Sequence, residues 1–173
     1  MSWRRSLVVS SLAAVLILLL SANWTSPPLP QNVRADQLVI EKAHRRLHVL
    51  SHGKLLRSYS IALGRSPVGA KLYEGDNKTP EGNYSIDRRN PRSAYHRALH
   101  ISYPSAEDRE RATSSGHSPG GEILIHGIKN GFGWLGRFHR WVDWTRGCIA
   151  LTNPEIEELW QVVPDGTPVR IVP

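Results

Sequence analysis

The chain has 173 residues, a length typical of a single domain. Its formal net charge is +7, but the basic residues are scattered and form no stripe with aromatic residues, so nucleic-acid binding is not predicted. The single cysteine excludes an internal disulfide, so its thiol is buried and inert, paired with another molecule, or reactive.

The first 22 residues have the pattern of an export signal. Arg4 and Arg5 precede an uncharged apolar run from 7 to 20, after which small residues and a proline cluster follow. The run of about 14 to 16 residues is shorter than the roughly 20 residues of a comfortable membrane span. This length favours a cleaved signal peptide, although an N-terminal membrane anchor stays open. We therefore predict an exported protein of the periplasm or cell envelope, with a signal peptide or anchor at 1–22, a linker at 23–35 and one domain at 36–173.

Short β-like runs dominate the rest of the chain. They are bounded by turn residues, such as Ser51 to Lys54, which predict a hairpin. Helical character before residue 150 is restricted to a turn at 107–111. The expected strands are 38–40, 47–50, 55–63, 84–87, 99–103, 122–126 and 167–172, with a long loop at 64–79, a polar connection at 88–96 and a loop at 114–121. The fold class predicted is mainly β, sandwich-like, with one C-terminal helix and a few short helical turns.

The C-terminal helix is predicted from its own signals. Asn153 is a good N-cap, Pro154 suits the first helical position, and acidic residues fill the first turn. Apolar residues at 156, 159, 160 and 163 share one face. The helix is expected to end at the Pro-Asp-Gly sequence of 164–166.

Cys148 lies between a glycine turn and an apolar segment, which places it at the rim of the core. A thiol is nucleophilic only as the thiolate, so it needs a base or a cation nearby. His126 ends an apolar strand and precedes a glycine, which leaves space around its ring. His139 is the competing candidate, because it is closer to Cys148 in sequence. Residue chemistry alone favours His126 but leaves both open.

Two further patterns receive a structural interpretation. His44 and His48 have an HxxxH spacing, but they lie in a strand-and-turn region, where this spacing does not place both on one face of a helix, so no metal site is predicted. The tryptophans at 134, 141, 144 and 160 are interpreted as core or lid packing rather than as a platform for sugar rings.

The sequence around these residues resembles the L,D-transpeptidase catalytic domain of the YkuD type. The resemblance is carried by Ile125-His126-Gly127, a spacer, and Thr145-Arg146-Gly147-Cys148. Upstream elements agree, namely Leu63-Gly64, the loop 67–76, the TPEGNY sequence at 79–84 and Gly120-Gly121. The spacer of 18 residues is slightly long, Arg146 replaces a frequent histidine, and the segment 131–144 is rich in aromatic residues. These departures are similar to a subgroup with a DWTxGCIAL motif.

The resemblance implies a role for each matched residue. Cys148 would be the nucleophile and His126 its general base, with the Gly127 carbonyl orienting the imidazole. Backbone N–H groups of Gly147 and Cys148 would form the oxyanion hole. Thr145 and Arg146 would line the substrate groove, and Arg146 could pair with a stem carboxylate, although an ordinary surface charge is equally compatible with its position. No metal or organic cofactor is implied.

The implied function is transfer of peptidoglycan tetrapeptide stems through a cysteine acyl-enzyme, with stem peptides and in some cases a wall-attached protein as partners. Some members of the DWTxGCIAL subgroup are thought to cut peptidoglycan-linked bonds instead. A cysteine hydrolase with the same site is therefore the alternative. A catalytically inactive wall-binding module is the third hypothesis, against which the Cys148 and His126 pair speaks.

Overall fold

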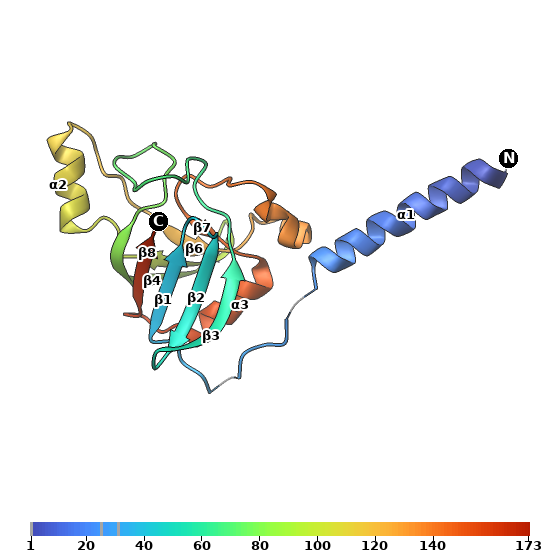
Figure 1. The fold of residues 1–173 in the computed structure, drawn as a ribbon, viewed down its shortest axis with the longest axis horizontal. Helices are drawn as coiled ribbons and strands as arrows, with labels where there is room; N and C mark the ends of the chain where they lie inside the picture. The colour runs from blue at the N-terminus through green and yellow to red at the C-terminus, as the bar shows by residue number, and fades with distance from the viewer. Residues whose placement is uncertain (1, 25, 31) are drawn as a thin grey trace.

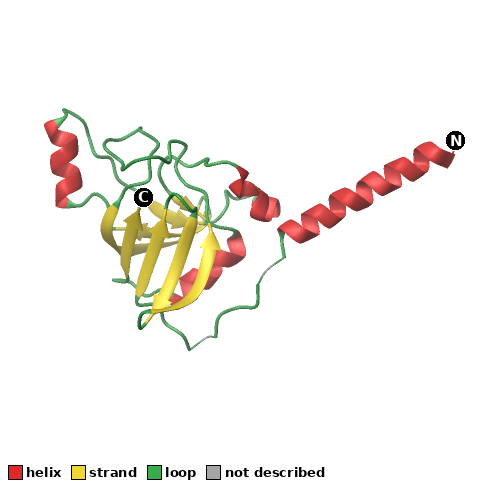
Figure 2. Ribbon diagram, in the orientation of Figure 1, coloured by secondary structure: helices red, strands yellow, loops and turns green. Residues whose placement is uncertain are grey.

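The computed structural model describes residues 2–24, 26–30 and 32–173, and it gives a mainly β domain with an extended N-terminal segment (Figures 1 and 2). The elements, in chain order, are α1 (Ser2–Ala22), β1 (Gln37–Glu41), β2 (Arg46–Ser51), β3 (Lys54–Ser60), β4 (Gly82–Ser93), β5 (His96–Ile101), α2 (Ala106–Ser114), β6 (Leu124–His126), the 3-10 helix η1 (Gly133–Trp141), β7 (Ile149–Ala150), α3 (Asn153–Val162) and β8 (Pro168–Val172).

The strands form one open mixed sheet in the order β3-β2-β1-β8-β4-β5-β6-β7. The pairs β1·β8 and β6·β7 are parallel and the other pairs are antiparallel. β4 joins the two halves of the sheet, because its first residues pair with β8 and its later residues pair with β5. Register shifts after Ile86 and Asn90 interrupt its ladder with β5, as β-bulges do where a strand bends. The predicted mainly β class is confirmed.

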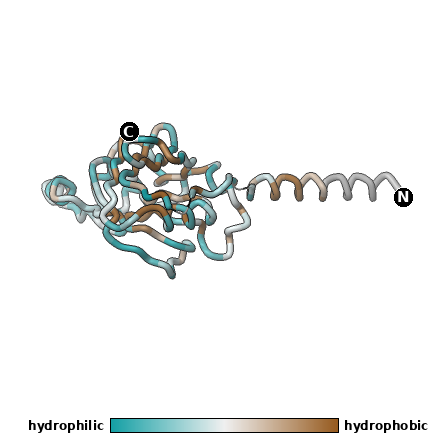
Figure 3. Tube along the Cα trace, turned by 90° about the horizontal axis from the view of Figure 1, so that it is seen from below, coloured by the Kyte–Doolittle hydropathy of each residue, from teal (hydrophilic) through white to brown (hydrophobic). Residues whose placement is uncertain are grey.

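The hydrophobic core contains residues from both halves of the sheet. Alternating residues of β1 and β8, such as Leu38, Ile40 and Ile171, point inward, which is the period of two expected for a half-buried strand. In the β domain, apolar stretches of the trace alternate with polar ones (Figure 3). α3 packs against β5 and buries Ile156 and Leu159, so the predicted apolar face is confirmed.

Three expectations about local structure were wrong. The polar stretch after Ile86 is not a connection, because β4 continues to Ser93 and β5 begins at His96. The N-cap of α3 is Thr152, whose N–H donates to the Glu155 carboxylate at 3.0 Å, rather than Asn153. A 3-10 helix forms in the aromatic segment, where none was expected.

Two tryptophans of the aromatic segment do not pack as predicted. Trp134 is 59% exposed and Trp141 is 78% exposed, so neither belongs to the core. Trp160, in contrast, lies under the guanidinium groups of Arg89 and Arg97, each 4.9 Å from its ring centroid. The prediction of core packing therefore holds for Trp160, which packs against the core, but not for Trp134 and Trp141.

α1 projects away from the β domain, and an irregular linker connects its C-terminal end to β1 (Figure 1). Over the described part of the chain, no helix has the run of apolar residues that a bilayer crossing requires. Of the regions predicted as signal and linker, positions 1, 25 and 31 lie outside the described residues.

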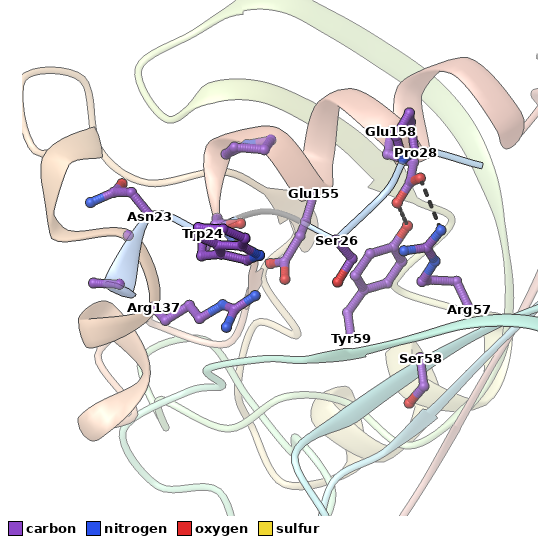
Figure 4. Close-up of a pocket in the computed structure, with 14 residues that line it drawn as sticks. Asn23, Trp24, Ser26, Pro28, Arg57, Ser58, Tyr59, Arg137, Glu155 and Glu158 are labelled. Carbon is purple, nitrogen blue, oxygen red and sulfur yellow. Dashed lines mark hydrogen bonds and ion pairs between the residues drawn. The ribbon is translucent and has the colours of Figure 1, made fainter. Parts of the chain in front are cut away.

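Glu158 of α3 binds the linker through a hydrogen bond. Its carboxylate accepts the hydroxyl of Tyr59 and lies 3.6 Å from the Arg57 guanidinium (Figure 4). It also accepts the N–H of Leu29 at 2.5 Å, and Arg57 donates to the Pro27 carbonyl at 2.7 Å. A cavity of about 320 Å³ lies beside these contacts, between the linker, β3, η1 and α3. Neither Cys148 nor His126 lines it.

Candidate active site

The register of β6 and β7 places Cys148 and His126 on the same face of the sheet. Ile125 lies opposite Ile149 and His126 lies opposite Ala150 in this parallel pair. Because side chains alternate along a strand, the buried Ile125 and Ile149 face the core while His126 points to the other face. Extending the ladder by one residue puts Cys148 on that same face, two positions from the residue opposite His126. Strand spacings give a diagonal of about 8 Å between their Cα atoms.

A tight turn presents Cys148. Gly147 has a φ of 131°, and a Cβ atom there would lie 2.6 Å from the Lys78 carbonyl oxygen, so only glycine fits. The buried Thr145 holds the turn from inside, because its hydroxyl donates to the Cys148 carbonyl at 2.7 Å and accepts the Gly147 N–H at 3.1 Å. The backbone N–H of Cys148 has no hydrogen-bond partner among the described residues.

This turn engages polar groups of two predicted site residues. The Thr145 hydroxyl makes its hydrogen bonds within the turn, and its place along the substrate groove stays a prediction. The Gly147 N–H is likewise donated to Thr145, which leaves Cys148 with the unoccupied donor of the predicted pair. Arg146 is exposed and makes no ion pair within the described ranges.

The Cys148 thiol is half-buried and rests on the chain that precedes β6. Its Sγ lies 3.5 Å from the carbonyl oxygen of Glu122, a residue with a left-handed backbone at φ 54°. Burial raises the pKa of the thiol above its usual value, because the apolar surroundings disfavour the thiolate. No hydrogen bond joins the thiol to His126 in the described part of the chain.

His126 is 2% exposed and is held in one orientation. Its Nδ1 lies 2.6 Å from the Gly127 carbonyl oxygen. A carbonyl can only accept, so Nδ1 carries the proton and Nε2 keeps a free lone pair. Burial lowers the pKa of His126 from 6.5 to about 4, and the bond to Gly127 opposes this only in part. The thiol and the imidazole are therefore both neutral at pH 7.

Two aromatic rings enclose the imidazole. The ring of Tyr95 lies 4.5 Å from the His126 ring, centroid to centroid, and Trp144 meets it edge-on at 5.7 Å. The Tyr95 carbonyl also accepts the N–H of Gly127 at 3.1 Å. Sequence reasoning missed Tyr95, because it lies in the stretch taken for a polar connection.

Asn153 braces the residue after His126. Its side-chain oxygen accepts the N–H of Ile128 at 2.9 Å and would lie 2.8 Å from a Cβ atom at Gly127. A larger residue at 127 would therefore collide with α3. The only sequence signal for Asn153 was its suitability as a helix cap, which pointed to a different role.

His139 belongs to the same aromatic cluster, and among the described residues it makes no hydrogen bond to the Cys148 thiol. Its Nδ1 accepts the indole N–H of Trp144 at 3.3 Å, which leaves the proton of the neutral ring on Nε2. Burial lowers the pKa of His139 to about 3. An apolar cavity of about 370 Å³, lined by residues such as Phe132, Phe138 and Val142, adjoins this histidine and Trp144. Among the described residues, no three His, Cys, Asp or Glu side chains gather as a metal site would need.

Comparison with known proteins identifies relatives of this chain. The family model for the L,D-transpeptidase catalytic domain, YkuD, matches residues 35–171. YafK of Escherichia coli strain K12, whose name assigns it provisionally to the L,D-transpeptidases, is 35% identical over 112 residues, covering 64% of this chain and 38% of YafK. YqjB of Bacillus subtilis strain 168, with a name of the same kind, is 27% identical over 161 residues, covering 90% and 81% of the two chains.

A solved structure agrees over most of the chain. The helical cell shape determining protein Pgp2 of Campylobacter jejuni superposes with a TM-score of 0.58 at 30% identity, covering 88% of this chain and 53% of Pgp2. Bd1075 of Bdellovibrio bacteriovorus shares the fold, with a TM-score of 0.56 at 23% identity, 87% of this chain and 52% of Bd1075. The chain thus spans about a third to a half of the length of YafK, Pgp2 and Bd1075.

Proposed function

This chain belongs to the YkuD family of L,D-transpeptidase catalytic domains, and from that premise we propose that it is an exported L,D-transpeptidase that acts on peptidoglycan tetrapeptide stems through a Cys148 acyl-enzyme. The names of its relatives connect the family to L,D-transpeptidation and to cell shape. The observation that carries the proposal is the neutral His126, whose Nδ1–H is held by Gly127 while its Nε2 stays free on the face that also bears Cys148.

In the first half of the reaction, His126 Nε2 takes the thiol proton as Sγ attacks the carbonyl carbon of the bond between the third and fourth stem residues. The carbonyl electrons move onto oxygen. When the carbon–nitrogen bond breaks, the leaving D-alanine amine takes the proton from Nε2, and a thioester remains. A free Nε2 lone pair is what the first step needs, and the tautomer fixed by Gly127 supplies it.

Charge on the tetrahedral oxygen needs donors near Sγ. The Cys148 N–H has no other partner and is the first donor we assign. The Gly147 N–H would join it only if it exchanged Thr145 Oγ1 for the substrate oxygen. Arg146 is exposed and unpaired within the described residues, so we assign it to a carboxylate of the stem peptide.

In the second half, an acceptor resolves the thioester. An amine of another stem or of a wall-attached protein loses its proton to His126 Nε2 and forms a new amide, and the thiol is regenerated. Water in place of the amine would give hydrolysis. The two outcomes share every residue named above, so only the products separate them.

Incubation with labelled disaccharide-tetrapeptides tests the proposal. We expect cross-linked dimers and free D-alanine from the mature protein, while tripeptide and D-alanine without dimers would identify the hydrolase. Absence of any product would favour an inactive wall-binding module. Cys148→Ser should abolish turnover.

His126→Gln and His139→Gln form a matched pair, because both histidines are buried beside Trp144. We expect the first to abolish turnover and the second to retain most of it. The reverse result would transfer the role of general base to His139.

We further propose that residues 1–22 direct export to the periplasm or cell envelope. N-terminal sequencing of the protein recovered from the envelope of a bacterial host should then begin close to Asn23. Recovery of the intact chain from the cytoplasm would refute the export proposal without touching the chemistry.

A further inference from the structure

The loop between β3 and β4 contains a buried ion pair that the reaction scheme does not use. Lys71 Nζ lies 2.8 Å from Asp76 Oδ1, and both side chains are 4% exposed. Lys71 also donates to the Tyr73 carbonyl at 2.9 Å. Burying two charges is costly, so such a pair is weak evidence for stability and calls for another explanation.

Asp76 organises the loop around its carboxylate. Oδ2 accepts the N–H groups of Leu72 at 2.7 Å and Tyr73 at 3.3 Å, while Oδ1 accepts the N–H of Lys78 at 3.0 Å in addition to Lys71. Burial alone would raise the pKa of Asp76, but the hydrogen bonds from Lys71 and the backbone outweigh it and lower the pKa. The carboxylate is therefore ionised at neutral pH and fixes both ends of the turn 72–78.

The fixed end of this turn supports the nucleophile. The carbonyl oxygen of Lys78 lies 2.6 Å from the place that a Cβ atom would take at Gly147, so it is in close contact with the turn that presents Cys148. The other side of the loop is joined to the same turn, because Arg65 N–H donates to the Thr145 carbonyl at 3.1 Å. Asp76 is thus connected to Gly147, the residue before Cys148, by its hydrogen bond from the Lys78 N–H and by the contact of the Lys78 carbonyl with Gly147.

We propose that Lys71 and Asp76 are positioning residues, which hold the Lys78 carbonyl against Gly147 and so keep the Cys148 N–H directed at the oxygen of a tetrahedral intermediate. This proposal rests on the proposed function for the role of that N–H. Both side chains are 4% exposed, so we assign neither of them a contact with the substrate. The effect of Asp76 should appear only in reactions that place negative charge on an oxygen beside Cys148, whereas the charge of Lys71 also lowers the pKa of the Cys148 thiol.

Two reagents separate this effect from a general change of the thiol. p-Nitrophenyl acetate acylates Sγ through a tetrahedral intermediate and releases p-nitrophenolate, whereas iodoacetamide alkylates Sγ by displacement of iodide without any oxyanion. We expect Asp76→Asn to lower the acylation rate at least about tenfold, a part of the loss seen when an oxyanion donor is removed outright. Alkylation should stay within about threefold of the unchanged protein, and Cys148→Ser gives the background of both assays.

Asp108→Asn is the matched control. Asp108 is 3% exposed, accepts the Tyr84 hydroxyl at 2.9 Å, and lies on α2 instead of the β3–β4 loop. The same chemical change at this buried carboxylate should leave both rates unchanged. A loss of acylation in this variant equal to that of Asp76→Asn would overturn the proposal.

Three other results would also overturn it. They are an unchanged acylation rate in folded Asp76→Asn, an equal fall of both rates, and an unchanged rate in Lys71→Met. Should Asp76→Asn fail to fold, Asp76→Glu, which keeps the charge and moves it by one methylene, is judged by the same two rates. A protein that shows the expected split but no turnover of stem peptides would keep the positioning role and refute the proposed function.

Discussion

Replacing His126 by glutamine tests whether the thiol is ionised before or during the reaction. In a resting thiolate–imidazolium pair, the pKa of the thiol is lowered and that of the histidine is raised. The structure shows the opposite directions, because burial lowers the pKa of His126 to about 4 and raises that of Cys148 above its usual 9.0. The raised pKa therefore leaves the resting thiol mostly protonated at pH 7.

The two reactions of Cys148 should therefore respond differently to His126→Gln. Alkylation by iodoacetamide at pH 7 samples the small resting thiolate fraction, which does not depend on His126, so its rate should change less than about threefold. Turnover of stem peptides needs proton removal during attack, and loss of a general base costs roughly 10² to 10⁴ in rate. Mass spectrometry follows the alkylation, and D-alanine release follows the turnover.

A pH series on the unchanged protein completes the test. Alkylation should rise with pH up to and beyond 9 as the thiol ionises. A plateau beginning below pH 7, or a loss of alkylation of tenfold or more in His126→Gln, would show that the resting site holds a preformed thiolate–imidazolium pair instead of two neutral groups.

Three further outcomes are expected. The free energy of unfolding should fall by about 3 kcal/mol on account of His126 as the pH drops from 6.5 to 4. The reason is that the unfolded chain binds a proton at this histidine, whereas the folded site stays neutral until the pH reaches its lowered pKa. Urea titrations at several pH values measure the loss, and His126→Gln should reduce it. Gly147→Ala should destabilise the fold by roughly 1–3 kcal/mol and abolish turnover, since the added methyl group meets the Lys78 carbonyl, and a wild-type melting temperature would contradict this. Tyr95→Leu should raise the pKa of His126 toward 6.5 by opening its surroundings to water, as an NMR titration of the imidazole would show, whereas an unchanged titration would mean that other groups keep the ring buried.

The strands that could be predicted are those whose residues alternate. Leu38 and Ile40 show the pattern directly, and α3 shows an apolar face with a period near 3.6. The second half of β4 has no such pattern, since the stretch from Arg88 to Arg92 is polar apart from Pro91 and largely exposed. It forms a strand because β5 offers backbone partners, and pairing of that kind leaves no trace in side-chain hydropathy.

The site could be predicted as a set of residues but not as a geometry. Cys148, His126 and Gly127 were selected by their neighbours in sequence and by family resemblance, and their catalytic roles stay predictions. Thr145 is predicted to line the substrate groove, and the structure adds that its hydroxyl bonds to neighbours within the turn. Asn153 was expected to cap α3, yet its side chain reaches the N–H of Ile128, 25 residues away in sequence. The Asn153 contact depends on how distant segments meet, which the local sequence does not reveal.

The same burial that keeps His126 unprotonated at pH 7 bears on how the lone thiol of the proposed exported enzyme would stay reduced. Oxidation of cysteine proceeds through the thiolate, so its rate follows the ionised fraction. Because burial raises its pKa, the Cys148 thiol would oxidise more slowly at pH 7 than an ionised thiol of equal accessibility and nucleophilicity. A neutral resting pair thus satisfies two requirements of the proposed exported enzyme. The nucleophile stays reduced between turnovers, and it becomes reactive only when a bound carbonyl lets Nε2 of His126 remove the proton as the carbon–sulfur bond forms.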